Sequence, residues 1–347
     1  MEEKIKAFVL YSPVDMRPQS LNMPKPNSDE ALVKIKSVGV CGSDVHYYRN
    51  GRIGSFIVKD PLILGHECSG EVVSVGNAVS NVKAGDRVVI EPGVPCRKCW
   101  YCKNGRYNKC PDIKFMATPP YDGGLVEYVA WPADFLIKMP DTMSFQNGAL
   151  VEPFAVGLFA TKRSGLYPSS SVAILGAGPI GLSTLEAVKA MGASDIICID
   201  TMANRLSVAK KMGATHVIDA KEEDVVEQVK KFTNGEGAHF VFETAGAAKT
   251  VQQTVELARE GGTVTLIGLP PEAEIKMPIV EAVIKELKFV TSFRYCNVFE
   301  EAVSLINHGR VNLEPLLTHE FSFDQTLEAF AVSEHEKDKA IKVMINL

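Results

Sequence analysis

The sequence predicts an α/β protein built from two modules, a β-rich module followed by a doubly wound parallel sheet. Segments 31–38, 70–76 and 86–91 partly alternate apolar and polar residues, as half-buried strands do, and glycine and proline separate them. After about residue 155, apolar strands alternate with helices, and the first strand–helix junction carries a Gly-x-Gly-x-x-Gly motif. The length of 347 residues agrees with two domains.

The second module alternates in a regular rhythm. Its predicted strands cover residues 171–175, 196–200, 216–218, 239–243 and 263–267, and its predicted helices cover residues 179–191, 204–212, 222–232 and 247–258. The strands are almost continuously apolar, which is typical of a parallel sheet covered by helices on both faces. A helix at 299–308 and a strand at 340–346 leave this rhythm, and we expect them to return to the first module.

Composition and charge exclude several classes of protein. Hydrophobic residues make up 46% of the chain and charged residues 23%, as in ordinary globular proteins, and the net charge is -5, whereas nucleic-acid-binding domains are usually basic. No apolar run is long enough to span a bilayer, and the N-terminus lacks the apolar core of a signal peptide. We therefore expect a cytoplasmic protein without nucleic-acid or membrane partners, with reduced cysteines and with Cys198 in the core.

Four cysteines share one polar loop with the spacing C-x2-C-x2-C-x7-C: Cys96, Cys99, Cys102 and Cys110. Such a loop cannot bury enough apolar area to order itself, whereas four thiolates can order it by binding zinc tetrahedrally. Nearby lysines and arginines should lower the pKa values of the thiols. Because four protein ligands leave no open position, the spacing predicts a structural zinc site. Reduced or disulfide-paired surface thiols are the alternative.

A dinucleotide site is predicted where strand 171–175 runs into the glycine motif. Gly176 permits the tight turn, Gly178 lets the backbone approach a pyrophosphate, and Gly181 lets the helix pack close to the strand. Asp200 ends the next strand, where a carboxylate binds the adenosine ribose and repels a 2′-phosphate, so NAD is favoured over NADP. Glycines that only pack a turn are the alternative. The expected cofactor-binding residues are Gly176, Gly178, Pro179, Ile180, Gly181, Asp200 and Arg205.

Cys41 and His66-Glu67 form a second candidate metal site. A thiolate, an imidazole and a carboxylate would give zinc three ligands and leave a position for water or substrate, which is the catalytic arrangement. Glu152, in Leu150-Val-Glu-Pro, is a fourth candidate. Taken singly, such a cysteine is more often a buried small hydrophobe and such a histidine a satisfied core or surface residue, and spacing alone does not join these segments.

The order of the motifs along the chain connects Cys41 with His66 and Glu67. Cys41-Gly-Ser-Asp, Gly65-His-Glu, the four-cysteine loop and the glycine motif resemble, in that order, the zinc-dependent medium-chain alcohol dehydrogenases, over essentially the whole chain. Within that superfamily the chain is most similar to the sorbitol (polyol) dehydrogenases. The segments that carry this similarity are Asp44-Val-His-Tyr-Tyr, residues 51–59, Ala117-Thr-Pro-Pro, Leu150-Val-Glu-Pro and Phe293-Arg-Tyr-Cys-Asn.

The resemblance implies a GroES-like catalytic domain, residues 1–154 and 293–347, and a Rossmann coenzyme domain, residues 155–292. It implies NAD, two zinc ions per chain (one catalytic and one structural) and a homotetramer. The implied ligands of the catalytic zinc are Cys41, His66 and Glu67. Glu152 is implied as a partner of the zinc-bound water that can exchange with Glu67, so which of the two acids contacts the metal stays open.

The reaction implied by the resemblance is the reversible oxidation of a polyol to a ketose. Ser43, His46 and Glu152 resemble the family's proton-transfer groups. The implied substrate-binding residues are Tyr47, Phe56, Phe115, Thr118, Arg294 and Tyr295. Plainer roles are a turn cap for Ser43, a surface position for His46, an ion pair for Arg294 and core packing for the aromatic residues.

Rival functions remain open. A related zinc dehydrogenase could act on L-threonine, 2,3-butanediol or a polyol phosphate, although Tyr47, Arg294 and Tyr295 favour a hydroxyl-rich substrate. A non-catalytic dinucleotide-binding protein would have no need of the complete ligand set Cys41, His66 and Glu67. A zinc-ribbon nucleic-acid binder is disfavoured by the acidic net charge.

Overall fold

The structure, a computed structural model, describes residues 3–347 and divides into two compact units. The first unit runs to Glu152 and also includes residues 299–307 and 317–347. The second unit comprises residues 153–298 and 308–316. Within the described residues, every helix is too short or too polar to cross a membrane.

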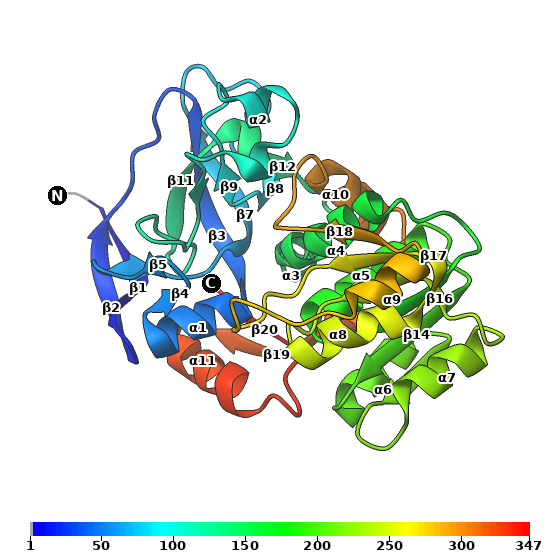
Figure 1. The fold of residues 1–347 in the computed structure, drawn as a ribbon. Helices are drawn as coiled ribbons and strands as arrows, with labels where there is room; N and C mark the ends of the chain where they lie inside the picture. The colour runs from blue at the N-terminus through cyan, green and yellow to red at the C-terminus, as the bar shows by residue number, and fades with distance from the viewer. Residues whose placement is uncertain (1–2) are drawn as a thin grey trace. The chain divides into compact units, whose positions relative to one another are not determined.

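A seven-stranded sheet forms the centre of the first unit (Figure 1). Its strand order is β12-β8-β7-β3-β20-β19, and β11 also pairs with β3. The bounds are β3 Glu30–Val40, β7 Glu67–Val75, β8 Arg87–Ile90, β11 Tyr128–Pro132, β12 Leu136–Lys138, β19 Leu317–Ser322 and β20 Lys342–Asn346. In the antiparallel pair of β20 and β3, Val343 lies opposite Val40, which confirms that the last strand returns to the first module.

Smaller elements surround this sheet. A second sheet has the order β2-β1-β6, and β4 with β5 and β9 with β10 form two-stranded pairs. The strand bounds are β1 Lys4–Ser12, β2 Asp15–Asn22, β4 Arg52–Ile53, β5 Phe56–Ile57, β6 Leu62–Ile63, β9 Gly93–Val94 and β10 Lys114–Phe115. The helix bounds are α1 Gly42–Asn50, α2 Trp100–Lys103, η1 Tyr107–Lys109, η2 Ala133–Phe135, α3 Phe145–Ala149, α10 Phe299–Asn307, η4 Phe323–Gln325 and α11 Thr326–His335.

Strand β3 shows how the sequence pattern leads the chain inward. Val33 and Ile35 are buried while Lys34 and Lys36 between them are partly exposed, as the period of two requires. From residue 37 to residue 40 every side chain is buried. The end of β3, and Cys41 after it, therefore enter the interior of the unit.

The second unit contains a six-stranded, fully parallel sheet with the order β15-β14-β13-β16-β17-β18. Its strands are β13 Ser171–Leu175, β14 Asp195–Asp200, β15 His216–Asp219, β16 Ala238–Glu243, β17 Ala258–Leu266 and β18 Lys288–Thr291. Every residue of β13 is buried, which requires cover on both faces of the sheet. The strand order reverses between β13 and β16, and such a switch point is where open parallel sheets bind dinucleotides.

Helices connect these strands (Figure 1). Contacts between neighbouring residues show that α5 packs beside α6 and that α7 packs beside α8. The helix bounds are α4 Val151–Ser164, α5 Pro179–Ala190, α6 Ala203–Met212, α7 Val225–Phe232, α8 Ala248–Leu257, α9 Ile279–Ile284 and η3 Glu314–Leu316. The predicted start of α7 at 222 is wrong, because Asp224 caps the helix by accepting hydrogen bonds from Val226 N and Glu227 N. The predicted boundary between helix 247–258 and strand 263–267 is also wrong. Strand β17 already begins at Ala258, and it reaches its main register with β16 after a bulge.

Candidate active site

Cys41, His66 and Glu67 meet in the first unit. One sulfur, one ring nitrogen and one carboxylate oxygen of the three lie within 4.8 Å of one another. Cys41 follows β3 as the N-cap residue of α1, and Glu67 begins β7 opposite Gly39 of β3. The pairing of β3 with β7 therefore brings together residues that are far apart in the sequence.

Asp44 fastens the two segments of this cluster to each other. Its buried carboxylate accepts hydrogen bonds from Cys41 N and Gly65 N, both at 3.0 Å, and lies 3.5 Å from His66 Nδ1. Burial alone would raise the pKa of Asp44, but His66 and the two N–H groups hold it below its usual value. Asp44 was missed as a site residue, although its place three residues after the helix N-cap is the signal of a capping box.

The cluster fits a zinc ion. A thiolate, an imidazole and a carboxylate are ligands that zinc prefers, and three of them leave the fourth position open. Burial by itself would lower the pKa of His66, yet Asp44 and Cys41 raise it well above its ordinary value. Surroundings that stabilise a positive charge on a buried imidazole also attract a metal cation.

Lys342 is a second residue that the sequence reasoning missed. Its Nζ lies 2.6 Å from Oε1 and 2.7 Å from Oε2 of Glu67, and both side chains are 1% exposed. Burial would lower the pKa of Lys342, but Glu67, Cys41 and Glu152 raise it. The one available signal was a lysine inside an otherwise apolar final strand, which does not name its partner.

The expected residues on α1 share one face of that helix. His46 and Tyr47 follow Ser43 by three and four residues in the helix that begins after the N-cap Cys41. Ser43 is partly buried, Tyr47 is buried, and His46 is exposed with its Nδ1 3.4 Å from Asn50 Nδ2.

Other expected residues of the first unit lie at different distances from the cluster. The ring of Phe115 has its centroid 5.8 Å from that of His66, and Thr118 N donates to the carbonyl of Phe115. Glu152 is buried in the first turn of α4 and is close enough to raise the pKa of Lys342. Phe56 is 44% exposed and lines a cavity of about 300 Å³ together with Pro119 and Pro120.

Arg294 and Tyr295 belong to the second unit, in the segment that follows β18. Tyr295 is buried, and the guanidinium of Arg294 lies 5.1 Å from the ring centroid of Phe293. Arg294 has a φ of 53°, a left-handed conformation that is uncommon for a residue with a side chain. Such backbone strain is concentrated at functional sites.

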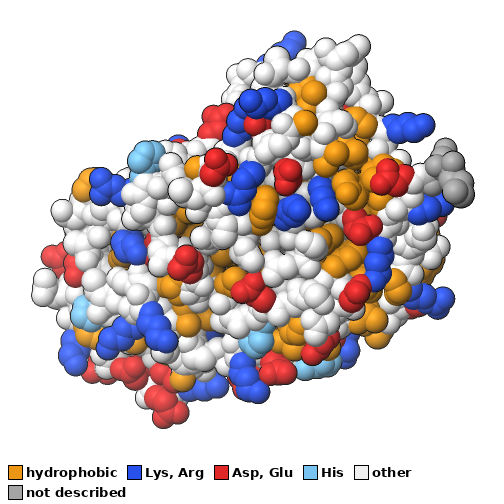
Figure 2. Space-filling view, turned by 180° about the vertical axis from the view of Figure 1, so that it is seen from behind, with side chains coloured by type: hydrophobic (Ala, Val, Ile, Leu, Met, Phe, Trp, Pro, Cys, Tyr) orange, Lys and Arg blue, Asp and Glu red, His pale blue; other side chains and the backbone are white. Residues whose placement is uncertain are grey.

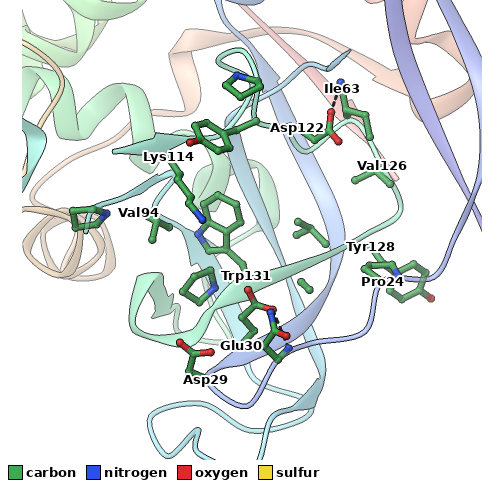
Figure 3. A pocket seen from close by; sticks show the side chains of 18 of the residues that line it. Pro24, Asp29, Glu30, Ile63, Val94, Lys114, Asp122, Val126, Tyr128 and Trp131 are labelled. Carbon is green, nitrogen blue, oxygen red and sulfur yellow. Dashed lines mark hydrogen bonds between the residues drawn. The ribbon is translucent and has the colours of Figure 1, made fainter. Parts of the chain in front are cut away.

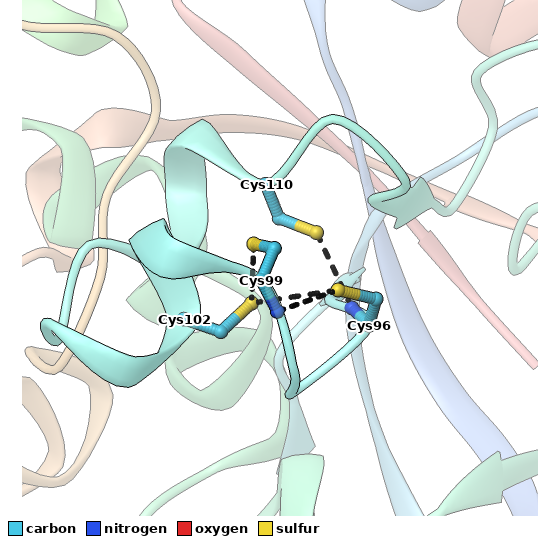
Figure 4. Close-up of side chains that lie close together, drawn as sticks. All are labelled: Cys96, Cys99, Cys102 and Cys110. Atoms are coloured by element: carbon cyan, nitrogen blue, oxygen red, sulfur yellow. Dashed lines mark hydrogen bonds between the residues drawn. The ribbon is translucent and has the colours of Figure 1, made fainter.

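The four cysteines of the polar loop converge on one point (Figure 4). Cys99 Sγ lies 3.3 Å from Cys102 Sγ, and two backbone N–H groups donate to sulfur, Cys96 N to Cys110 Sγ and Cys99 N to Cys96 Sγ. The four thiols thus form the closed donor set that a structural zinc site requires, and we call this loop, residues 96–110, the cysteine lobe.

Lysine and arginine side chains were expected to lower the thiol pKa values, and for Cys96 this expectation is wrong. Its pKa is lowered to about 7 by the backbone N–H groups of Lys98 and Cys99, ahead of any basic side chain. Burial, together with hydrogen bonds from neighbouring thiols, raises the pKa of Cys102 to about 12. Arg97 instead pairs with Asp134, with Nη2 2.7 Å and Nε 3.0 Å from its two carboxylate oxygens.

Glu91 connects the cysteine lobe to β8. Tyr107 Oη donates to Glu91 Oε1 at 2.5 Å, and Trp131 Nε1 donates to the Glu91 carbonyl at 3.0 Å. Burial raises the pKa of Glu91 to about 7 from an ordinary value of 4.5, although the hydrogen bond from Tyr107 opposes the rise. Glu91 is therefore a titratable anchor of the lobe near neutral pH.

This shift predicts a pH dependence of stability. Between about pH 4.5 and 7 the folded protein holds a proton on Glu91 that the unfolded chain has lost, so stability falls as pH rises through that range. Glu91→Gln removes the cost of a buried negative charge at this position. It should raise the free energy of unfolding at pH 8 by up to about 3 kcal/mol, but much less at pH 5. Thermal unfolding of both proteins at the two pH values checks this, and an equal effect at both would contradict it.

The glycine motif has the geometry that close packing demands. Gly176 has a φ of 97°, and a Cβ on Gly181 would lie 1.8 Å from the Gly176 carbonyl oxygen. Gly178 is the N-cap residue of α5, whose first two residues are Pro179 and Ile180. A Cβ on Gly178 would have the guanidinium of Arg205 as its nearest neighbour, at 3.7 Å, so the face of this glycine is open to a ligand.

Asp200 and Arg205 lie beside this turn. Asp200 Oδ2 accepts a hydrogen bond from Ala177 N at 2.7 Å, and Oδ1 accepts from Thr201 N and Met202 N. Arg205 Nη1 lies 3.9 Å from Asp200 Oδ2, and its buried Nε has no hydrogen-bond partner. The carboxylate thus braces the glycine turn as well as facing the place where a strand-end acid meets an adenosine ribose.

A large cavity of the first unit lies elsewhere. Its volume is about 1040 Å³, and Figure 3 shows Trp131 and Lys114 pointing into it. Of the expected site residues only Cys96 lines it. The two clusters of possible metal ligands found among residues 3–347 are the group Cys41, His66 and Glu67 and the cysteine lobe, so the former, and not this cavity, is the candidate active site.

The molecular surface mixes charges of both signs. Figure 2 shows lysine and arginine side chains interspersed with aspartate and glutamate over the displayed face. A nucleic-acid-binding surface would instead show a stripe of positive charge. This face therefore gives no support to the zinc-ribbon alternative.

Comparisons with known proteins agree with the two sites. Residues 27–141 match the alcohol dehydrogenase GroES-like domain, and residues 179–308 match the zinc-binding dehydrogenase family. Sorbitol dehydrogenase of Bacillus subtilis is 43% identical over 343 residues, which cover 99% of this chain and 97% of the relative. An Escherichia coli oxidoreductase of unknown specificity, ECK1772, has a similar structure, with a TM-score of 0.95, 41% identity and 99% of both chains covered.

A structure with another substrate in its name is also similar. 2R,3R-butanediol dehydrogenase of Bacillus subtilis has a TM-score of 0.91 at 32% identity, with 99% of each chain covered. The resemblance to zinc-dependent alcohol dehydrogenases, the predicted fold class and the assignment as a zinc-dependent oxidoreductase are therefore confirmed. The chain belongs to the zinc-dependent medium-chain alcohol dehydrogenase superfamily, and sorbitol dehydrogenases are among its close relatives.

Proposed function

We propose that this protein reversibly oxidises a polyol of the sorbitol or xylitol type to the ketose, with NAD as the hydride acceptor. The observation that carries the proposal is the cluster of half-buried Cys41 with buried His66 and Glu67, which offers three ligands and an open fourth position. It stands in a chain that is 43% identical to a sorbitol dehydrogenase over nearly its full length.

The proposed roles follow from chemistry and placement. Zinc, when bound, supplies a Lewis acid that lowers the pKa of a substrate hydroxyl, and NAD, when bound, supplies the hydride acceptor. Ser43 and His46 carry the released proton outward, because they share a face of α1 and the imidazole of His46 is exposed to solvent. Glu152, a buried carboxylate near Lys342, offers a second acceptor for the proton.

Substrate binding is assigned to a hydroxyl-recognising set and an apolar wall. Tyr47, Thr118, Arg294 and Tyr295 offer donors and acceptors for several hydroxyls, and Phe56 and Phe115 supply apolar surface. The proposed catalytic domain comprises residues 1–154 and 293–347, and the proposed coenzyme domain comprises residues 155–292. The first compact unit, which combines the chain up to Glu152 with residues 299–307 and 317–347, supports a catalytic domain of separate segments, whereas residues 293–298 and 308–316 group with the second unit.

The test of this function is a substrate panel. NADH formation should appear with sorbitol and xylitol, should be much slower with L-threonine and 2,3-butanediol, and should stop after removal of zinc by a chelator. Galactitol 1-phosphate tests the polyol phosphate alternative. Activity confined to threonine, butanediol or the phosphate would keep the zinc chemistry and reject the polyol pocket. No activity on any alcohol, with full NADH binding, would favour the non-catalytic alternative.

Coenzyme preference gives a further prediction. Asp200→Asn combined with Thr201→Arg should raise the ratio of kcat/KM for NADP over NAD at least about tenfold, because the charge that repels a 2′-phosphate is replaced by one that attracts it. The amide of asparagine can still accept the hydrogen bonds of Thr201 N and Met202 N. Thr201→Arg alone is the control and should shift the ratio less. An unaltered ratio in the double variant would contradict the role given to Asp200.

We also propose a homotetramer that acts in the cytoplasm. The second unit exposes an apolar face of α9, the helix that precedes β18 in the chain. Strand β18 is an edge strand of the sheet, and such an edge pairs readily with another chain. The side chains of this face are 58–75% exposed: Ile279, Val280, Val283 and Ile284. A reducing compartment suits the protein because the cysteines of residues 3–347 are thiols rather than disulfides and the cysteine lobe needs four of them.

The apolar face predicts a variant that separates the subunits. Val283→Glu should lower the mass of the assembly in solution, because burying an unpaired carboxylate at an interface costs more than the valine contact stabilises. Light scattering coupled to size exclusion measures this. Val73→Glu, at a 44% exposed valine of β7, is the matched control and should leave the mass unchanged. An unchanged mass for Val283→Glu would place the subunit contacts elsewhere.

A further inference from the structure

The last strand of the chain, β20, places the ammonium group of Lys342 beside the cluster of Cys41, His66 and Glu67. Lys342 Nζ contacts both carboxylate oxygens of Glu67, at 2.6 and 2.7 Å, and lies 3.3 Å from the carbonyl oxygen of Val40. Val40 is the residue before Cys41, so one ammonium group touches both strands that carry the cluster. The residue reaches this place because β20 pairs with β3, which in turn pairs with β7.

The Glu67 carboxylate has little freedom in this position. Gly39 lies opposite Glu67 in the pairing of β3 and β7, and a Cβ on Gly39 would stand 2.0 Å from Glu67 Oε2. The carboxylate therefore lies against the backbone of β3 on one side and is held by the ammonium of Lys342 through both oxygens. Its orientation toward the cluster is set before any metal binds.

The same contact has a consequence for metal affinity. A carboxylate that shares its charge with an ammonium group is a weaker ligand than a free one, because the ammonium group repels the metal and competes with it for the same oxygens. Without the cation, Glu67 would be a buried, unpaired anion beside the Cys41 thiol, which is costly in the metal-free protein and is relieved when a metal binds. Loss of the lysine should therefore tighten metal binding.

We propose that Lys342 is a positioning residue of the metal site, whose ammonium group holds both oxygens of Glu67 and limits how tightly that carboxylate binds the metal. The inference rests on the zinc site assigned under the proposed function. A looser ligand keeps the fourth position available for exchange of substrate and product. Lys342 itself touches neither substrate nor coenzyme in this assignment.

The test measures metal binding rather than turnover. Protein with zinc retained in the cysteine lobe is stripped at the Cys41 cluster, and Co²⁺ is titrated while its visible absorption is recorded. Lys342→Met should bind Co²⁺ about tenfold more tightly than the unaltered chain and shift its absorption bands, whereas Lys342→Arg, which keeps a cation, should restore the original affinity. Lys285→Met, which removes a lysine bonded to backbone carbonyls in the second unit, is the matched control and should change neither.

Two outcomes would overturn the inference. If Lys342→Met lowers the unfolding temperature but leaves Co²⁺ affinity and spectrum unchanged, or weakens binding, the ion pair is only structural. If Lys342→Met does not fold, Glu67→Gln is compared with the Glu67→Gln/Lys342→Met double variant, in which the charged pair is absent. The inference requires a difference below about twofold there, and a tenfold difference would overturn it. Failure of the unaltered chain to bind Co²⁺ through a single thiolate would instead reject the proposed zinc site itself.

Discussion

Cys41→Ala is expected to lower kcat/KM for polyol oxidation by about 10³-fold or more and to reduce the zinc content from two ions per chain to one. The Cys41 cluster offers a metal only three protein ligands, and alanine removes the one that carries a thiolate. Lewis-acid stabilisation of a developing alkoxide is worth several kcal/mol, and each 1.36 kcal/mol is a tenfold change in rate. Initial rates and elemental analysis of the purified variant measure the two effects.

The control for this variant is a cysteine outside both metal sites. Cys198→Ala removes a fully buried thiol from β14 in the second unit and should cost some stability while keeping two zinc ions and the rate of oxidation. NADH binding should survive Cys41→Ala as well, because the glycine motif and Asp200 belong to the second unit. A Cys41→Ala protein that kept both zinc ions and its activity would show that the catalytic metal is held elsewhere.

Local patterns in the sequence predicted local parts of the site well. The close approach of Gly181 to the Gly176 carbonyl lies within six residues of chain, so the glycine spacing carries the information that this contact needs. The convergence of Cys96, Cys99, Cys102 and Cys110 has the same origin. Asp44 could have been predicted on the same grounds, because the hydrogen bond that its carboxylate accepts from Cys41 N belongs to an ordinary capping box at the start of α1.

Long-range pairing explains what the sequence could not supply. Lys342 and Glu67 are 275 residues apart and meet only because β20 joins the sheet beside β3. No periodicity in either segment encodes that neighbour. For the same reason the spacing left the join of Cys41 to His66 open, and the family resemblance supplied it before the register of β3 and β7 gave its geometry. The junction at Ala258 was misjudged because a bulge, which depends on a pairing strand, has no local signature.

Cys102→Ser is expected to cost the cysteine lobe its zinc and its order while leaving most of the chemistry intact. Metal binding supplies the folding free energy of such a lobe, about 10 kcal/mol or more in small zinc domains, and a serine hydroxyl is a poor substitute for a thiolate. Two short helices, α2 and η1, and the exposed side chains of Trp100 and Tyr101 offer little apolar burial to replace it. The variant should hold one zinc ion per chain, be cleaved by protease between residues 96 and 110, and unfold at a lower temperature.

The hydrogen bond from Tyr107 to Glu91 connects the cysteine lobe to the sheet. Disorder of the lobe should therefore loosen β8 but not the pairing of β3 and β7 that assembles the Cys41 cluster. The rate of polyol oxidation at low temperature should therefore stay within about threefold of the original, in contrast to the effect of Cys41→Ala. Lys103→Ser, at the exposed neighbour of Cys102, is the matched control and should keep both zinc ions. A Cys102→Ser protein with two zinc ions would refute the four-thiolate site. A thousandfold loss of activity with an ordered lobe would mean that this metal, too, takes part in the chemistry.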